Sequence, residues 1–154
     1  MASERDEVLS NLKAARSELL AAVDGLSDEQ LSRQGCVGEW TAKDVLSHVS
    51  SWDEVCARDF RRIARGGAPG FAAFKEERVD EYNGVLMALR LHFPAAQARR
   101  ELEEARAEVL AALSALPDTH FAKGQFARIV MDVQAGHDRD HAQAIRNWRQ
   151  GQGS

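Results

Sequence analysis

The chain has 154 residues, of which 44% are hydrophobic and 29% charged, and its formal net charge is −4. These values are ordinary for one globular domain spanning residues 1–154, and the negative charge argues against a nucleic-acid-binding surface, which needs concentrated positive charge. No run approaches the ~20 apolar residues that cross a bilayer, and the N-terminus is charged where a signal peptide is apolar. We therefore expect a cytoplasmic protein that contacts neither membranes nor nucleic acid.

Composition also indicates the fold class. Alanine, leucine, glutamate and arginine are abundant, long β-branched runs are absent, and there are only three prolines, which favours helices over strands. The two cysteines, Cys36 and Cys56, are too few and too far apart for a disulfide framework or a paired-cysteine zinc site. The sequence predicts an all-α protein with both thiols reduced and with no role that the sequence assigns to them.

The first third of the chain reads as a long helix, a short helical turn and a loop. Residues 3–24 carry an apolar stripe that ends at Gly25, and residues 27–30 (SDEQ) have the capping-box pattern that begins a helix. Residues 32–39 read as a loop. The stripe of the first helix is expected to consist of Val8, Leu12, Leu19, Leu20 and Val23.

A second long helix is predicted over residues 41–65. Thr41 supplies an N-cap, and apolar residues then recur at helical spacing. Residues 66–70 (GGAPG) form a turn, and residues 71–93 read as a less regular helical stretch that we expect to lie across an open end of the bundle.

Two more long helices complete the prediction, over residues 94–116 and 125–149. The inward face of the first is expected to comprise Leu102, Val109, Leu110, Leu113 and Leu116. No internal repeat with a period of 20 to 50 residues is visible. Four long amphipathic helices predict a four-helix bundle with an extra irregular helical insertion between helices two and three.

Two histidines stand out in the last predicted helix. His137 and His141 lie four residues apart, and therefore one turn apart on one face, together with the apolar residues Phe126, Val130, Val133, Ala144 and Trp148. Buried imidazoles need polar partners, which here are either a metal ion or ordinary hydrogen-bond acceptors such as carboxylates and carbonyls. The pair alone does not decide between these alternatives, so a third ligand is needed.

His48 is the candidate for that third ligand. It follows Val45 by three residues and precedes Trp52 by four, which places it on the inward face of the second long helix. Three histidines from two helices would leave a position on one ion for water or substrate, as catalytic sites do. Cys56 lies about 12 Å further along the same helix and is expected in the core, while His92 and His120 are expected near helix ends as surface or capping residues.

These segments carry a resemblance to a known family. The stretch GEWTAKDVLSHVSSWDE at residues 38–54, combined with HDRDHAQAIRNW at residues 137–148, resembles the DinB/YfiT-like metalloenzymes, and the resemblance covers nearly the whole chain. It implies a four-helix bundle that holds one divalent metal ion, often zinc or nickel, through His48, His137 and His141.

The resemblance also implies a range of chemistry. Characterised relatives include thiol S-transferases that use mycothiol or bacillithiol, a mycothiol-dependent maleylpyruvate isomerase, and hydrolases that protect against a genotoxin. Tyr82 and Asn83 are similar to the corresponding region of the thiol-transferase and toxin-protection branches. With Trp52, which suits either a pocket wall or plain core packing, they are our candidates for a substrate pocket.

Three hypotheses follow from this reading. The leading one is a metal-dependent transferase or hydrolase that acts on a small electrophile in detoxification or stress response, with a low-molecular-weight thiol as an optional co-substrate. The second is a non-catalytic protein that binds a metal or sequesters a small molecule, and the third is a metal-free bundle. The catalytic residues are not assigned, three imidazoles suit several metals, and a homodimer is compatible with the sequence.

Overall fold

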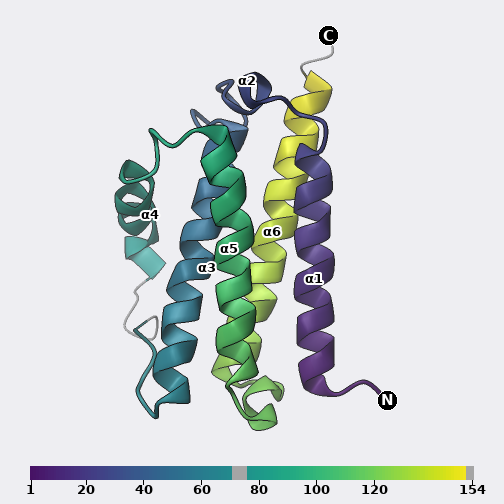
Figure 1. Ribbon diagram of the computed structural model, residues 1–154, viewed down its shortest axis with the longest axis vertical. Helices are drawn as coiled ribbons and strands as arrows, with labels where there is room; N and C mark the ends of the chain where they lie inside the picture. The colour runs from purple at the N-terminus through teal and green to yellow at the C-terminus, as the bar shows by residue number, and fades with distance from the viewer. Residues whose placement is uncertain (71–75, 152–154) are drawn as a thin grey trace. The chain divides into compact units, whose positions relative to one another are not determined.

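The computed structural model describes residues 1–70 and 76–151, and within these residues the chain is helical throughout, apart from turns, loops and one isolated bridge between Val37 and Trp40. This confirms the predicted all-α helical bundle fold (Figure 1). The helices, in chain order, are α1 (Glu4–Val23), α2 (Asp28–Leu31), α3 (Ala42–Ala64), α4 (Val79–Ala88), α5 (Ala95–Ser114) and α6 (Phe126–Gly151). Short 3-10 helices η2 (Glu76–Arg78) and η3 (Asp118–Phe121) precede α4 and α6. No helix in the described part of the chain combines the length and apolar character required to cross a membrane.

Local sequence signals explain where the helices begin and end. Ser3 caps α1 by accepting a hydrogen bond from the Asp6 backbone N–H at 3.1 Å, while Asp6 reaches back to the Ser3 N–H. The predicted capping box of Ser27 and Gln30 is confirmed at the start of α2. Gly25 follows α1 with a φ of 75°, a left-handed conformation that glycine adopts without strain.

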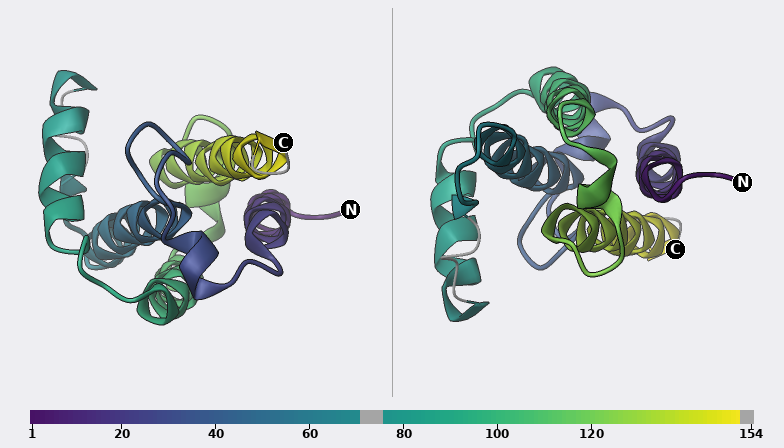
Figure 2. Two further views of the ribbon diagram at one scale, coloured as in Figure 1. Left: turned by 90° about the horizontal axis from the view of Figure 1, so that it is seen from above. Right: turned by 90° about the horizontal axis from the view of Figure 1, so that it is seen from below.

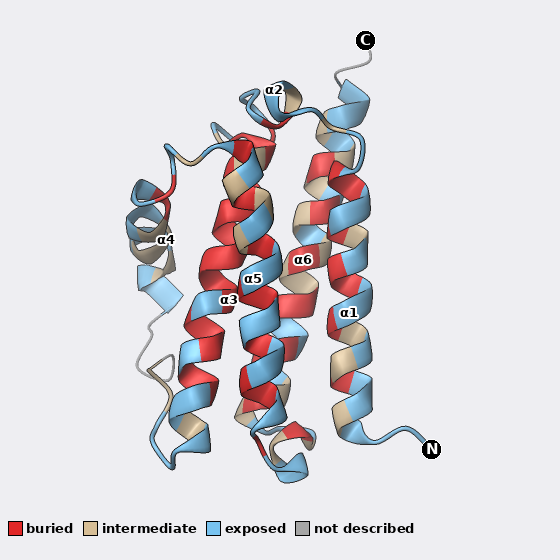
Figure 3. Cartoon of the chain, in the orientation of Figure 1, coloured by how far each residue is buried: buried red, intermediate tan, exposed pale blue. Residues whose placement is uncertain are grey.

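The described residues form two compact units, of which the first comprises residues 1–42 and 117–151. Its main elements, α1 and α6, run side by side in the same direction (Figures 1 and 2). The ends of the two helices set their register: Lys123 donates its backbone N–H to Glu4 near one end, and Arg149 donates to the carbonyl oxygens of Ala22 and Asp24 at the other. Figure 3 shows the buried residues of α1 along one face of the helix.

The second unit comprises residues 43–116 and contains most of α3, together with α4 and α5. Arg106 of α5 bonds to Asp53 of α3, and Arg61 of α3 pairs with Glu108 of α5. Helix α4 runs crosswise to α3 (Figure 2) and bonds to its middle, where Trp52 donates to Asn83; Arg90, in the turn that follows α4, donates to Glu54 of α3. The expectation that this segment lies across an end of the bundle is therefore wrong, and residues 71–75, its expected start, lie outside the described residues.

The two units are built alike. Residues 12–28 (LKAARSELLAAVDGLSD) and 102–118 (LEEARAEVLAALSALPD) are identical at nine of 17 positions, with a spacing of 90 residues. In each unit the arginine of this segment, Arg16 or Arg106, bonds to a buried aspartate on the neighbouring helix, Asp138 or Asp53. Sequence and contacts together indicate that residues 12–28 and 102–118 are repeats, each with an arginine that bonds to a buried aspartate. The spacing of 90 residues is longer than the periods of 20 to 50 residues, at which the sequence shows no repeat.

Three leucine and valine positions differ from the sequence prediction. Leu20, Leu110 and Val133, all expected to face inward, are exposed by 41%, 42% and 64%. Leu20 and Leu110 occupy equivalent positions in the repeat, so the same error arises twice. Both lie next to a leucine or valine that is fully buried, and a helix can direct only one of two consecutive residues to the centre of its buried face.

Candidate metal centre

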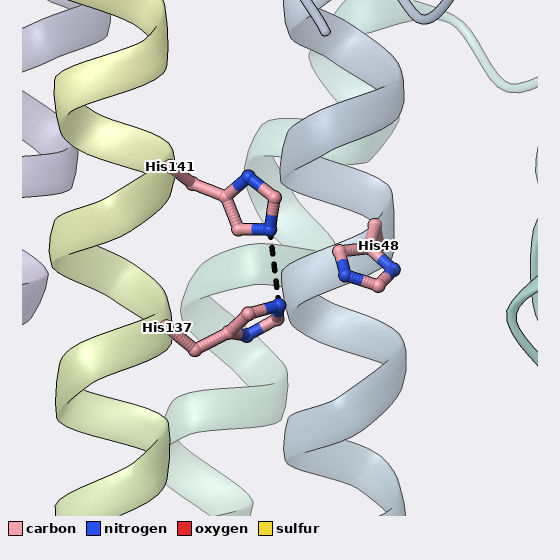
Figure 4. A group of neighbouring side chains, drawn as sticks. All are labelled: His48, His137 and His141. Carbon is pink, nitrogen blue, oxygen red and sulfur yellow. Dashed lines mark hydrogen bonds between the residues drawn. The ribbon is translucent and has the colours of Figure 1, made fainter. Parts of the chain in front are cut away.

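His137 and His141 face each other on α6. Their Nε2 atoms are 3.0 Å apart, and their ring centroids are 4.5 Å apart with the ring planes at 73° (Figure 4). The four-residue spacing places both side chains on one face of the helix, as the sequence predicts. A hydrogen bond at this distance requires one ring to donate its N–H to the lone pair of the other. The two side chains therefore direct the same type of nitrogen atom toward one point.

The environment keeps the second of these imidazoles neutral. Burial and, to a smaller extent, the neighbouring His137 ring lower the pKa of His141 to about 4, although Asp138 and Asp140 oppose the shift. Neutral imidazole is the form that coordinates a metal ion, because the coordinating nitrogen must carry a lone pair. At neutral pH, His141 therefore does not have to lose a proton before it binds an ion.

His48 lies on α3, where its side chain faces inward with only 4% of the residue exposed. The next turn of α3 is buried as well, since Trp52 is only 7% exposed. In this turn the Ser51 hydroxyl donates to the His48 carbonyl oxygen at 2.7 Å. Among the described residues, His48, His137 and His141 form a group in which each offers one ring nitrogen, and these three nitrogens lie within 4.8 Å of one another. A histidine cluster is therefore present (Figure 4).

The donor set fits a divalent metal ion. Two imidazole nitrogens bound to one tetrahedral zinc at roughly 2.0–2.1 Å lie about 3.3 Å apart, so the Nε2 atoms of His137 and His141 at 3.0 Å need only a small outward movement. Imidazole is a ligand for zinc, nickel, copper and iron alike. A third nitrogen within 4.8 Å lets the group complete three coordination positions through side-chain rotation.

A comparison with known protein families includes the helices that carry the three histidines. A family model described as the DinB superfamily matches residues 11–145, a range that contains all three histidines. The chain belongs to the DinB superfamily. A search of curated proteins found no match. Family membership confirms the resemblance that the sequence motifs indicate, and it leaves the reaction of this DinB-superfamily member to be inferred from its own residues.

The three residues predicted to form a substrate pocket in this DinB-superfamily chain do lie together. The indole Nε1 of Trp52 donates to Asn83 Oδ1 at 2.9 Å, and the rings of Trp52 and Tyr82 are 5.7 Å apart at a tilt of 43°. Trp52 is buried, whereas Tyr82 and Asn83 on α4 are half-buried. Because Trp52 follows His48 by one turn, this cluster begins next to one of the three histidines. Its role as a substrate pocket stays a prediction.

Other titratable residues fall outside the group. Cys56 is buried, as expected of a core residue, and Cys36 is buried too; neither forms a disulfide within the described residues. His92 is exposed and His120 is half-buried in η3.

Sequence reasoning missed the buried ion pair between Arg16 and Asp138. The Asp138 side chain has no exposed surface, and Arg16 bonds to both of its oxygens, from Nε at 2.9 Å and from Nη2 at 3.2 Å. A signal was available in the sequence, because Arg16 follows Leu12 by four residues and precedes Leu19 by three. A charged residue in step with an apolar stripe indicates a buried charge that needs a partner.

Proposed function

We propose that this protein is a metal-dependent enzyme that holds one divalent ion, zinc or nickel, through His48, His137 and His141. The observation that carries the proposal is the pair of Nε2 atoms 3.0 Å apart on α6, with a third imidazole nitrogen in the same group. Membership of the DinB superfamily supports it, since the match covers all three residues. Three neutral nitrogen ligands leave at least one position on the ion open, as in catalytic sites.

The ion would act as a Lewis acid that makes a bound water or thiol nucleophilic at neutral pH. The chain's own contribution is to hold three uncharged ligands in place, so that the net positive charge of the ion is retained. The lowered pKa of His141 supports this role, because its imidazole stays neutral well below pH 7.

For the reaction, we propose transfer of a thiol to a small electrophile, or hydrolysis of such a compound, in detoxification or stress response. The cluster of Trp52, Tyr82 and Asn83 supports a small organic substrate, because it offers aromatic surface and a fixed amide, and its Trp52 follows His48 by one helical turn. The Asn83 side chain holds the indole in one orientation, so the aromatic surface is preorganised. A low-molecular-weight thiol is the co-substrate in the transfer reaction.

Metal content is the first test. Protein purified without an affinity tag and analysed by inductively coupled plasma mass spectrometry should contain about one zinc or nickel ion per chain. The His137→Ala variant should lose this metal, while His92→Ala, which removes an exposed histidine outside the group, should retain it. Equal metal content in wild type and His137→Ala would remove the proposed centre.

Turnover is the second test, and it separates an enzyme from a binding protein. The metal-loaded protein is mixed with monochlorobimane and a panel of low-molecular-weight thiols, and formation of the fluorescent conjugate is followed. An enzyme gives many products per chain and loses the activity in His137→Ala. A non-catalytic binder, which is the alternative function, gives at most one bound molecule per chain.

A further inference from the structure

Asp138 lies next to His137 in sequence and three residues before His141, and its carboxylate bonds to Arg16 in the contact with α1. There the guanidinium of Arg16 grips it with two parallel bonds of 2.9 and 3.2 Å, and the exposed fractions of the two side chains are 9% and 0%. A two-bond contact between planar groups restricts both distance and orientation, which a single bond does not.

This contact controls the direction in which α6 presents its histidines. In a helix, successive side chains are rotated by about 100°, so His137 lies about 100° and His141 about 60° around the axis from Asp138. Any rotation of α6 that moves the two imidazoles must also move the Asp138 carboxylate. Because the carboxylate is buried and gripped by Arg16, such a rotation breaks a buried ion pair, which is costly.

The other ion pairs and side-chain hydrogen bonds between α1 and α6 restrict this rotation less. Arg139 pairs with Glu18 and Arg128 with Glu7, but these side chains are partly exposed, and exposed ion pairs contribute little. Arg149 donates to two backbone carbonyl groups at the far end of α1, which fixes the position of α6 along its axis more than its rotation at the level of the histidines.

We propose that Arg16 is a positioning residue of the metal centre: by holding Asp138, it sets the rotation of α6 and thereby the direction of His137 and His141. This inference rests on the proposed function in treating the histidines as metal ligands. Arg16 itself would not touch the ion. Its effect would be to reduce the freedom that the two ligands must lose when the ion binds.

The repeat provides a matched control. Arg106 binds Asp53 with the same two distances, 2.9 and 3.2 Å, and nearly the same burial, but Asp53 lies on α3, five residues beyond His48, so this pair can orient one ligand and not two. The test variant is Arg16→Met/Asp138→Leu and the control is Arg106→Met/Asp53→Leu. Each replaces an ion pair with apolar side chains and leaves no buried charge behind.

The measurement is the dissociation constant for Zn²⁺, obtained by competition with a chromophoric chelator, after circular dichroism has shown that each variant is helical. We expect the dissociation constant to rise roughly tenfold or more in Arg16→Met/Asp138→Leu and to stay within about threefold of wild type in the control. If the apolar variant does not fold, the Zn²⁺ dissociation constant of Arg16→Lys is measured instead. Lysine keeps the positive charge but cannot form both hydrogen bonds to Asp138, so binding should weaken by a smaller factor. Unchanged affinity in the folded Arg16 variants would overturn the inference.

A second readout separates this inference from the proposed function. If wild-type protein binds no Zn²⁺, the proposed metal centre fails, and nitrogen chemical shifts of the imidazoles in metal-free protein then test the positioning role. The signals of His137 and His141 should shift in Arg16→Met/Asp138→Leu and not in the control. Unchanged signals would show that the pair is structural only.

Discussion

Arg16 and Arg106 lie 90 residues apart and make the same contact: each grips a buried aspartate through Nε at 2.9 Å and Nη2 at 3.2 Å. In one case the aspartate is Asp138 on α6, and in the other it is Asp53 on α3. Each pair joins one of the two repeated segments, in α1 or in α5, to another helix of the same unit. The same buried contact therefore occurs once in each unit.

Removing one partner of such a pair should be far more harmful than removing both. Arg106→Met leaves the Asp53 carboxylate buried without its guanidinium, and we expect a loss of about 3–5 kcal/mol in the free energy of unfolding. Arg106→Met/Asp53→Leu should recover most of this loss, because no buried charge remains. Urea unfolding followed by circular dichroism measures both, and a single variant that costs less than about 1 kcal/mol would contradict the expectation.

Asn83→Ala should loosen the contact between α4 and α3. The Trp52 indole N–H loses its acceptor, and we expect a cost of about 1 kcal/mol in the free energy of unfolding. Asn147→Ala is the control, since Asn147 accepts a similar hydrogen bond from Gln143 on the exposed face of α6 and should cost close to nothing. Equal losses in the free energy of unfolding for the two variants would show that the hydrogen bond between Trp52 and Asn83 does not stabilise the fold.

Removing the metal should lower the melting temperature of the wild-type protein. A ligand that binds only the folded state, present at 100 times its dissociation constant, contributes about 2.7 kcal/mol. Differential scanning fluorimetry with and without a chelator should show this shift in wild type. The His141→Ala variant should melt at one temperature under both conditions, and an equal chelator effect in this variant would point to metal bound elsewhere.

Alkylation of Cys36 should depend on pH in an unusual way. Burial raises the pKa of its thiol to about 11, and the thiolate is the reactive form, so reaction with iodoacetamide should be slow at pH 8 and still increase above pH 10. Because the pKa is higher in the folded state, the protonated thiol adds to the free energy of unfolding. This contribution is complete below about pH 9 and is lost as the pH rises toward 11. Mass spectrometry of the alkylated peptide, with Cys36→Ser as the blank, measures the rate; a plateau near pH 9 would contradict a buried thiol.

Local signals in the sequence were sufficient to predict the helices. The four long helices begin and end within two residues of the predicted positions, because caps, glycine and proline act within a single turn. The spacing of His137 and His141 likewise fixes their relative position, since both belong to one helix. His48 was placed on the inward face of α3 by its neighbours Val45 and Trp52, and it is buried there.

Features that depend on contacts between helices were harder to predict. Val133 shares a helix face with His137 in projection, yet it is exposed, because periodicity gives the direction of a side chain and not what covers it. The crosswise path of α4 depends on the bonds from Trp52 to Asn83 and from Glu54 to Arg90, which join residues more than 30 positions apart. Arg16 and Asp138 lie 122 positions apart, so the sequence around either residue does not identify its partner.

The parallel pairing of α1 with α6 has a consequence for synthesis. Helix α1 leaves the ribosome well before α6, the helix against which it packs, since more than 100 residues separate Arg16 from Asp138. During translation the apolar face of α1 therefore lacks α6, the helix that finally covers it. Contacts across so long a loop also form slowly. The nascent chain should therefore acquire its protease resistance only after α6 has emerged.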